Sequence, residues 1–377
     1  MVKNKEIDNL CAIMSSVKEP RKARIVLYPL EEVLLTTLLG FLSGCTSWEE
    51  KRINGMLNID WLRNFYPFKR GIASHDTLNR IFHLIPSEST EYMLNRMVKL
   101  SIKDDKTGKL ISIDGKCLAG SATIKDLQTS KADGGQTCKL IVNAYCHDDG
   151  LCIEQKATEL GGERDGVLEV LDKISVAGNI ILLDAGNTTS SIVDKIQEKK
   201  GDYVITLKAN CKESFNKAKE LFQTRREEAI LTVTKERSKG RGETRQCSVL
   251  NVESESVLTK KWTGICSLIE MVRTRKIGEK ESTETMYYIS SMKQKNIDYQ
   301  YIIRSHWGIE NKLHWRLDVI FKEDASKNRI KNCAVNLAAI RRIALNIFQR
   351  DIDKVSTPIK MVKFRFNLEY RNYILGI

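Results

Sequence analysis

The stretch Ile111-Ser112-Ile113-Asp114-Gly115-Lys116 decides the fold of this chain, because it is an apolar run that ends in an acidic residue and a glycine. Short apolar runs bounded by turn residues are typical of buried strands. A second run of this kind, Ile180-Ile-Leu-Leu-Asp184, lies further along the chain. We therefore predict two strands that each carry an aspartate to the point where the strand leaves the core.

The segments around these two runs predict an ordered series of strands and helices. The turn sequence His147-Asp-Asp-Gly150 separates two β-rich runs, as expected for a hairpin. The predicted strands are Leu110–Ile113, Leu140–Cys146, Leu151–Ala157, Ile180–Leu183 and Tyr203–Leu207, with amphipathic helices before and after the fourth. The order β-β-β-α-β-α-β is that of a ribonuclease-H-like α/β core, a mixed sheet flanked by helices, although other α/β folds also alternate strands and helices.

The pattern on either side of this core predicts the domain organisation. Leu30, Val33, Leu34 and Leu38 recur at helical spacing after Pro29, so residues 1–105 are expected to form a helical domain. Residues 106–377 are expected to form a second, α/β domain. Within it, a run of strands over about 225–293 is predicted to be a β-rich insertion.

The composition favours a protein that binds nucleic acid. Among 377 residues, 61 Lys and Arg stand against 48 Asp and Glu, which gives a net charge of +13. The ten cysteines form no C-x-x-C pair, and we expect them to be reduced thiols of a cytoplasmic protein. The longest apolar stretch, Ile25 to Gly44, contains Glu31 and Glu32, so no membrane span is predicted.

A glutamate far downstream completes an acidic set. On a helix from about Asp298 onward, an apolar stripe is formed by Ile302, Ile309, Leu313, Leu317 and Ile320. Glu310 falls at the edge of this stripe, so we expect its side chain beside the core rather than in solvent. Carboxylates suit Mg²⁺, and Asp114, Asp184 and Glu310 could hold two such ions, with Mn²⁺ as a substitute.

Two alternatives stand beside this metal site. An aspartate at a strand end is often only a turn or cap residue. In addition, His306, Glu310, His314 and Asp318 follow one another at spacings of four, a pattern that could bind zinc or iron. A histidine site would leave the two aspartates without a role, and the chain has no second E-x-x-H helix. We therefore favour the three carboxylates.

Several motifs resemble bacterial insertion-sequence DDE transposases of the H-repeat-associated (ISAs-type) family. They are Arg304-Ser-His-Trp-Gly-Ile-Glu-Asn-Lys-Leu-His-Trp-Arg-Leu-Asp-Val319, Phe321–Asp324, Ile113–Ser121, Leu183–Ala185 and Gly201–Asn210. The resemblance implies that Asp114, Asp184 and Glu310 are the catalytic acidic triad. It also implies cleavage of a DNA strand at an element end, followed by attack of the freed 3′-hydroxyl on target DNA. By the same resemblance, we expect residues 1–105 to serve DNA binding or dimerisation and residues 106–377 to form the catalytic domain.

We expect double-stranded DNA as the partner, a homodimer in the DNA complex, and a place at the bacterial nucleoid. The candidate DNA contacts are Lys116, Lys208, Arg241, Arg245, Arg304, His306, Asn311, Lys312 and His314. Two other hypotheses stay open: a nuclease of the same fold that cuts without joining, and an inactive transposase relic that only binds DNA.

Overall fold

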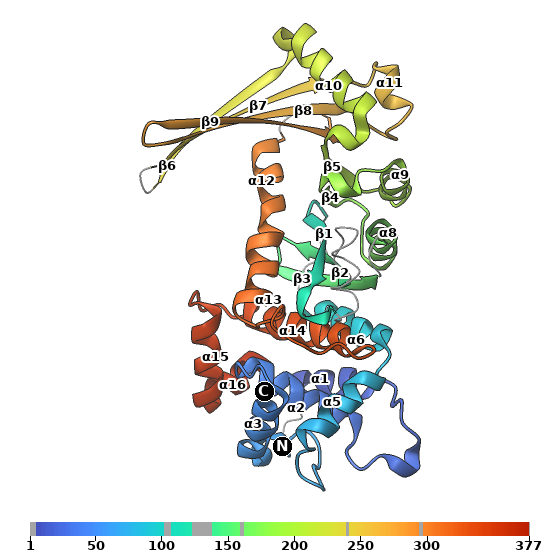
Figure 1. Ribbon diagram of the computed structural model, residues 1–377, viewed down its shortest axis with the longest axis vertical. Coiled ribbons are helices and arrows are strands. Elements are labelled where there is room, and N and C mark those ends of the chain that lie inside the picture. Colours follow the sequence, from blue (N-terminus) through green and yellow to red (C-terminus); the bar gives the residue numbers. More distant parts are fainter. Residues whose placement is uncertain are drawn as a thin grey trace.

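The computed structural model describes residues 5–101, 107–122, 138–158, 162–238, 241–293 and 297–376. The molecule is elongated, with a helical block at one end, a mixed sheet in the middle and long antiparallel strands at the other end (Figure 1). No helix within these described ranges is long and apolar enough to cross a membrane.

Five strands and two helices form the middle of the molecule. The strands are β1 (Leu110–Leu118), β2 (Lys139–Cys146), β3 (Leu151–Thr158), β4 (Ile180–Leu183) and β5 (Asp202–Leu207), and the helices are α8 (Glu163–Lys173) and α9 (Ser190–Glu198). Their order in the sheet is β3-β2-β1-β4-β5, in which β1, β4 and β5 are parallel and β2 is antiparallel to both neighbours. This topology confirms the predicted ribonuclease-H-like fold class.

The register of β1 brings the two aspartates together. Ile113 is the last residue of β1 that pairs with β4, and its partner Leu183 directly precedes Asp184. Asp114 does not end its strand, as the sequence predicted, because β1 continues to Leu118 along β2. Asp114 instead follows the end of the parallel pairing, beside the position where β4 stops.

The β-rich segment extends the same sheet instead of forming a separate module. Its strands are β6 (Ile230–Ser238), β7 (Arg241–Asn251), β8 (Ser267–Ile277) and β9 (Lys280–Ser290). Because β9 pairs with β5, one continuous nine-stranded sheet results. The helices α10 (Lys212–Thr224) and α11 (Ser256–Thr259) lie at this end (Figure 1).

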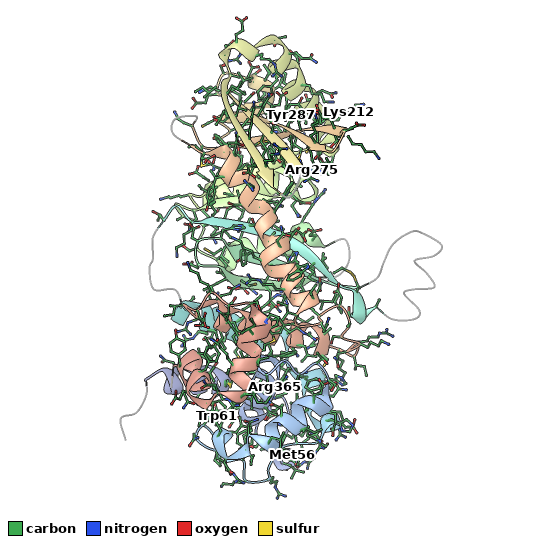
Figure 2. All side chains as sticks on the ribbon, turned by 90° about the vertical axis from the view of Figure 1, so that its left-hand side faces the viewer. Met56, Trp61, Lys212, Arg275, Tyr287 and Arg365 are labelled. Atoms are coloured by element: carbon green, nitrogen blue, oxygen red, sulfur yellow. A yellow bond between two sulfur atoms is a disulfide. The ribbon has the colours of Figure 1, made fainter. Side chains whose placement is uncertain are left out.

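The helical block combines both ends of the chain. Its members are α1 (Lys5–Ser15), α2 (Leu30–Leu42), α3 (Trp48–Leu57), α4 (Ile59–Leu62), α5 (His75–Leu84), α6 (Ser87–Ser101), α14 (Cys333–Gln349), α15 (Thr357–Phe366) and α16 (Leu368–Leu375). The side-chain view shows Trp61 and Arg365 in this block, far from Tyr287 and Arg275 on the long strands (Figure 2). One apolar cluster joins Leu34 of α2, Ile340 of α14 and Ile113 of β1, so the block and the sheet share a core.

The helix that carries Glu310 is not a continuous α-helix. Helix α12 (Tyr299–Ile309) passes into a π-helical turn (Glu310–His314) and then into α13 (Trp315–Val319). The sequence predicted unbroken 3.6-residue periodicity here. A π-helical turn inserts one extra residue into the register and is frequent at functional sites.

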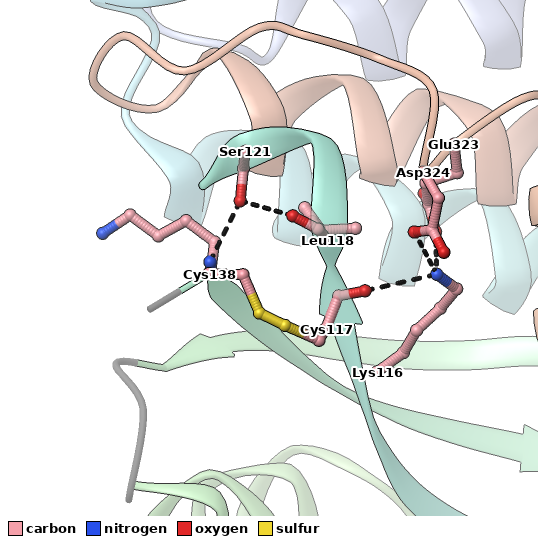
Figure 3. Close-up of a disulfide and its surroundings, with 8 residues drawn as sticks. Lys116, Cys117, Leu118, Ser121, Cys138, Glu323 and Asp324 are labelled. Atoms are coloured by element: carbon pink, nitrogen blue, oxygen red, sulfur yellow. Dashed lines mark hydrogen bonds and ion pairs between the residues drawn. A yellow bond between two sulfur atoms is a disulfide. The ribbon is translucent and has the colours of Figure 1, made fainter. Parts of the chain in front are cut away.

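One cysteine pair departs from the prediction of reduced thiols. Cys117 on β1 and Cys138, directly before β2, form a disulfide with their Cα atoms 5.9 Å apart (Figure 3). Antiparallel pairing of β1 and β2 brings the two residues together, although they are distant in sequence. The other eight cysteines, all within the described residues, form no disulfide.

Candidate active site

Three acidic residues from separate elements line one cavity of about 250 Å³. Asp114 comes from β1, Asp184 follows β4, and Glu310 opens the π-helical turn after α12. His306 and Trp307 of α12 contribute to the wall. The structure therefore brings the three predicted site residues to one place.

The conformation of Asp184 is fixed by the short turn that follows it. Its Oδ1 accepts hydrogen bonds from the backbone N–H of Asn187 at 3.2 Å and from the Asn187 side-chain Nδ2 at 3.0 Å. Both donors belong to the same residue, so they orient the carboxylate group. Asp184 therefore caps the short turn and also lines the cavity. The two roles that the sequence left open for this aspartate, turn cap and site residue, are compatible.

Asp114 lies in an environment that opposes its negative charge. Burial is the main cause that raises the pKa of its carboxyl to about 8, and the charges of Glu310 and Asp184 add to the effect. The side chain is only 14% exposed. Three carboxyl groups around one cavity are electrostatically suited to a bound cation.

Glu310 is more open than the sequence predicted. Its side chain is 64% exposed, not beside the core, at the point where α12 passes into the π-helical turn. A hydrogen bond from His314 is the main cause that lowers the pKa of Glu310. Glu310 therefore carries its charge at the mouth of the cavity.

His314 lies close to the carboxylates of Asp114 and Glu310. Its Nδ1 is 3.7 Å from Oδ2 of Asp114 and 3.5 Å from Oε2 of Glu310, and its side chain is 6% exposed. Possible ligand atoms of Asp114, Glu310 and His314 all lie within 4.8 Å of one another, and Asp184 is outside this tightest group. The geometry thus leaves two candidate metal sites: three carboxylates, or two carboxylates with one histidine.

Sequence reasoning missed a fourth carboxylate, Glu163, in the first turn of α8. Its Oε1 accepts a hydrogen bond from Asn187 Nδ2 at 2.9 Å, and the same amide also donates to Asp184. Its charge contributes to the raised pKa of Asp114. Gly115 permits this approach, because a Cβ there would lie 2.6 Å from Glu163 Oε1. An acidic residue opening the helix after the third strand was the available sequence signal.

His306 connects α12 to the sheet. Its Nδ1 lies 3.3 Å from the hydroxyl oxygen of Ser112, which also lies 2.6 Å from Nε2 of His147. Burial is the main cause that lowers the pKa of His306. The structure thus places this candidate DNA contact in the wall of the cavity.

Lys116 is not available as a phosphate contact. Its ammonium group is buried and lies 2.7 Å from a carboxylate oxygen of Asp324, with Glu323 at 3.9 Å (Figure 3). It also lies 2.8 Å from a carboxylate oxygen of Asp318. Lys116 is therefore directed to α13 and the loop after it, where three acidic residues compensate its charge.

Two of the candidate arginines are also paired. Arg304 donates to both carboxylate oxygens of Glu236, at 2.5 and 3.1 Å. Arg245 lies 3.1 Å from Glu236 and 2.6 Å from Glu243, and its side chain is only 12% exposed. These ion pairs connect α12 to the β6–β7 hairpin.

Three of the remaining candidate DNA contacts, Lys208, Asn311 and Lys312, are exposed. Lys208 also lines the same cavity as the acidic residues. Asn311 donates a hydrogen bond from Nδ2 to the backbone oxygen of Trp307. The side chain of Arg241 lies outside the described part of the chain.

Comparison with known proteins identifies the family. Residues 105–347 match the family described as "Transposase DDE domain", and residues 11–98 match the family described as "DDE_Tnp_1-associated". The chain belongs to the DDE transposase family. At the level that the family establishes, its function is that of a DNA transposase, which does not favour the nuclease or relic hypotheses.

Individual relatives of this DDE transposase cover nearly its whole length. The "H repeat-associated putative transposase YhhI" of Escherichia coli is 32% identical over 99% of this chain and 98% of the relative. The "Putative protein YbfL" of the same species has the same identity and coverage. Among solved structures, a piggyBac transposase synaptic complex with hairpin DNA aligns with 99% of this chain and 79% of that chain, at 11% identity and a TM-score of 0.43.

Proposed function

We propose that this transposase cleaves DNA strands at the ends of an insertion sequence and joins the freed 3′-hydroxyl to target DNA. Asp114, Asp184 and Glu310 would be its catalytic residues. The observation that carries the proposal is their convergence on one cavity from three separate elements. Hydrolysis and strand transfer are both in-line displacements at phosphorus, so a single acidic site can serve both steps.

The donor set fits divalent metal ions, and we propose Mg²⁺, with Mn²⁺ as a substitute and two ions per site. Asp114, Asp184 and Glu310 would hold them through carboxylate oxygens, which Mg²⁺ prefers. Bound there, the ions would supply Lewis-acid activation of the phosphodiester and of the attacking oxygen. Asp114 supports this assignment, because burial and neighbouring negative charge raise its pKa to about 8.

Side chains around the cavity would orient the acidic residues and the DNA. The two hydrogen bonds from Asn187 hold Asp184 toward the cavity. Exposed Glu310 lies at the entrance, where it can approach DNA that enters from solvent. Lys208 borders the same cavity, and we propose that it contacts a phosphate beside the cleaved bond.

We further propose that different parts of the chain have different roles. Residues 1–105 would bind element ends or form the dimer contact, and residues 106–377 would carry the chemistry, with the insertion at about 225–293 extending the DNA-binding surface. Pairing two element ends calls for two active sites, which favours a homodimer. The net charge of +13 suits binding to double-stranded DNA at the nucleoid.

A two-stage assay tests the proposal. In the first stage, Mg²⁺-dependent cleavage of DNA that carries an element end is measured for Asp114→Ala, Asp184→Ala and Glu310→Ala, with the exposed Glu198→Ala as the control. In the second stage, precut ends are offered to test joining. We expect the three site variants to lose both activities and the control to keep them. Cleavage without joining by the wild type would favour a nuclease, and full activity of Glu310→Ala would refute the site.

A further inference from the structure

We propose that His314 is a positioning residue that turns a protonated Nδ1 toward Asp114 and Glu310, in a tautomer fixed by Asn143 and Arg342. The proposal rests on the proposed function, because it concerns how the acidic residues are held. It also favours the three-carboxylate metal site over the site with one histidine, because a metal ion at Nδ1 would have to displace the proton from that nitrogen.

The chain of contacts begins at Arg342 on α14. Its Nε donates to Oδ1 of Asn143 at 2.6 Å, and both side chains are fully buried. Its Nη1 donates to Glu323 at 2.9 Å and to the backbone oxygen of Ala338 at 2.9 Å. Because a guanidinium group only donates hydrogen bonds, the atom of Asn143 that faces it must be the amide oxygen.

The orientation of Asn143 then determines what His314 can do. With Oδ1 turned to Arg342, the amide nitrogen donates to the backbone oxygen of Ile141 at 3.1 Å and faces Nε2 of His314 at 3.4 Å. A proton on Nε2 would set one N–H group against another in a buried place, where unsatisfied donors are costly. Nε2 therefore accepts, and Nδ1 of His314 carries the ring proton.

The Nδ1–H group faces the two carboxylates. It lies 3.7 Å from Asp114 and 3.5 Å from Glu310, so one donor reaches toward both. An N–H group in this place would favour the charged form of both carboxylates, whose charges oppose each other. Glu310 and His314 are four residues apart within the π-helical turn, so both side chains reach the cavity side. Asp114, Asp184 and Glu310 remain as the metal ligands.

The tautomer can be observed directly in the metal-free full-length protein. The chain has five histidines, so ¹⁵N-histidine labelling gives a resolvable set of ring signals, and His314→Gln assigns the signal of interest. We expect a protonated-type shift for Nδ1 and an unprotonated-type shift for Nε2. The reverse pattern would overturn the proposal. Since the measurement needs neither DNA nor metal, its result is independent of whether the protein cleaves DNA.

A second variant tests the cause of the tautomer. In Asn143→Asp, the new carboxylate still accepts from Arg342 but turns an acceptor toward His314, so we expect Nε2 to become protonated. Asn346→Asp is the matched control, because Asn346 is also buried and hydrogen-bonded, to the backbone of Cys152. It should leave the His314 signals unchanged. An unprotonated Nε2 in Asn143→Asp would contradict the proposed role of Asn143.

Discussion

Gly308 of α12 lies against the imidazole ring of His147, so closely that a Cβ at position 308 would be 2.9 Å from ring atoms Cε1 and Nδ1. Such a contact forces the ring or the helix to move. His147 is held by Ser112, and Glu310 lies two residues beyond Gly308. We predict that Gly308→Ala lowers the DNA cleavage rate at least about tenfold, because small displacements of catalytic groups are costly.

Overpacking at this contact should also lower the free energy of unfolding of Gly308→Ala, by about 1–3 kcal/mol. Thermal unfolding and cleavage rates measure the two effects. Gly242→Ala is the control, since a Cβ there would meet no atom within 4 Å. Wild-type cleavage by Gly308→Ala would show that the α12 contact with His147 does not position Glu310.

The buried ring of His147 predicts a dependence of stability on pH. Burial is the main cause that lowers its pKa to about 4, and the positive charge of Lys312 adds to it. An unfolded histidine has a pKa of about 6.5, so the unfolded state binds more protons between these values. The contribution of His147 is therefore complete above about pH 6.5 and is lost as the pH falls toward 4.

The expected loss from His147 between pH 7.5 and pH 5 is roughly 2 kcal/mol. Denaturant unfolding at the two pH values measures it. His147→Gln should show a smaller difference than the wild type, whereas His75→Gln, at a half-exposed site, should keep the wild-type difference. An equal loss in His147→Gln would show that other groups cause the acid sensitivity.

Glu236 forms ion pairs with two arginines that are candidate DNA contacts. It pairs with Arg304 and with Arg245. We predict that Glu236→Gln binds double-stranded DNA more tightly and with a steeper salt dependence, since each added phosphate contact steepens the slope by about 0.9. Fluorescence anisotropy over a range of salt concentrations measures this. Weaker binding with an unchanged slope would indicate instead that Glu236 orients the arginines for DNA. Glu169→Gln, which removes a distant pair with Lys156, is the control.

Lys116 should support the fold rather than bind DNA. Lys116→Met would leave the acidic residues around it uncompensated, and breaking a buried ion pair costs about 3–5 kcal/mol. We predict a large fall in unfolding temperature without a change in the salt slope of DNA binding. The exposed Lys208→Met should do the opposite, with wild-type stability and a shallower slope. If Lys116→Met unfolds like the wild type, the ion-pair network does not stabilise the protein.

Local sequence patterns were sufficient to predict the core strands. The run Ile180–Leu183 was predicted with the bounds that the structure has, because it is a largely buried parallel strand with no polar residue. The start of α5 depends on equally local chemistry, since the Ser74 side chain accepts a hydrogen bond from the backbone N–H of Thr77. Such features depend on residues close together in sequence.

Features that depend on distant residues could not be predicted in this way. The π-helical turn is invisible to a periodicity analysis, because the apolar stripe through Leu313 and Leu317 fits an unbroken α-helix equally well. The burial of Lys116 depends on Asp318 and Asp324, which the fold brings to it from the far end of the chain. Glu163 likewise joins the site only because α8 packs beside β1.

The central claim is that three carboxylates hold the divalent ions, and Mn²⁺ titration followed by electron paramagnetic resonance tests it most directly. The variants are Asp114→Asn, Asp184→Asn, Glu310→Gln and His314→Ala. We predict that the three carboxylate variants lose Mn²⁺ binding, whereas His314→Ala retains binding that is weaker by about 10–100-fold, as for a residue that supports a ligand. Wild-type affinity in Asp184→Asn, together with complete loss in His314→Ala, would contradict the account.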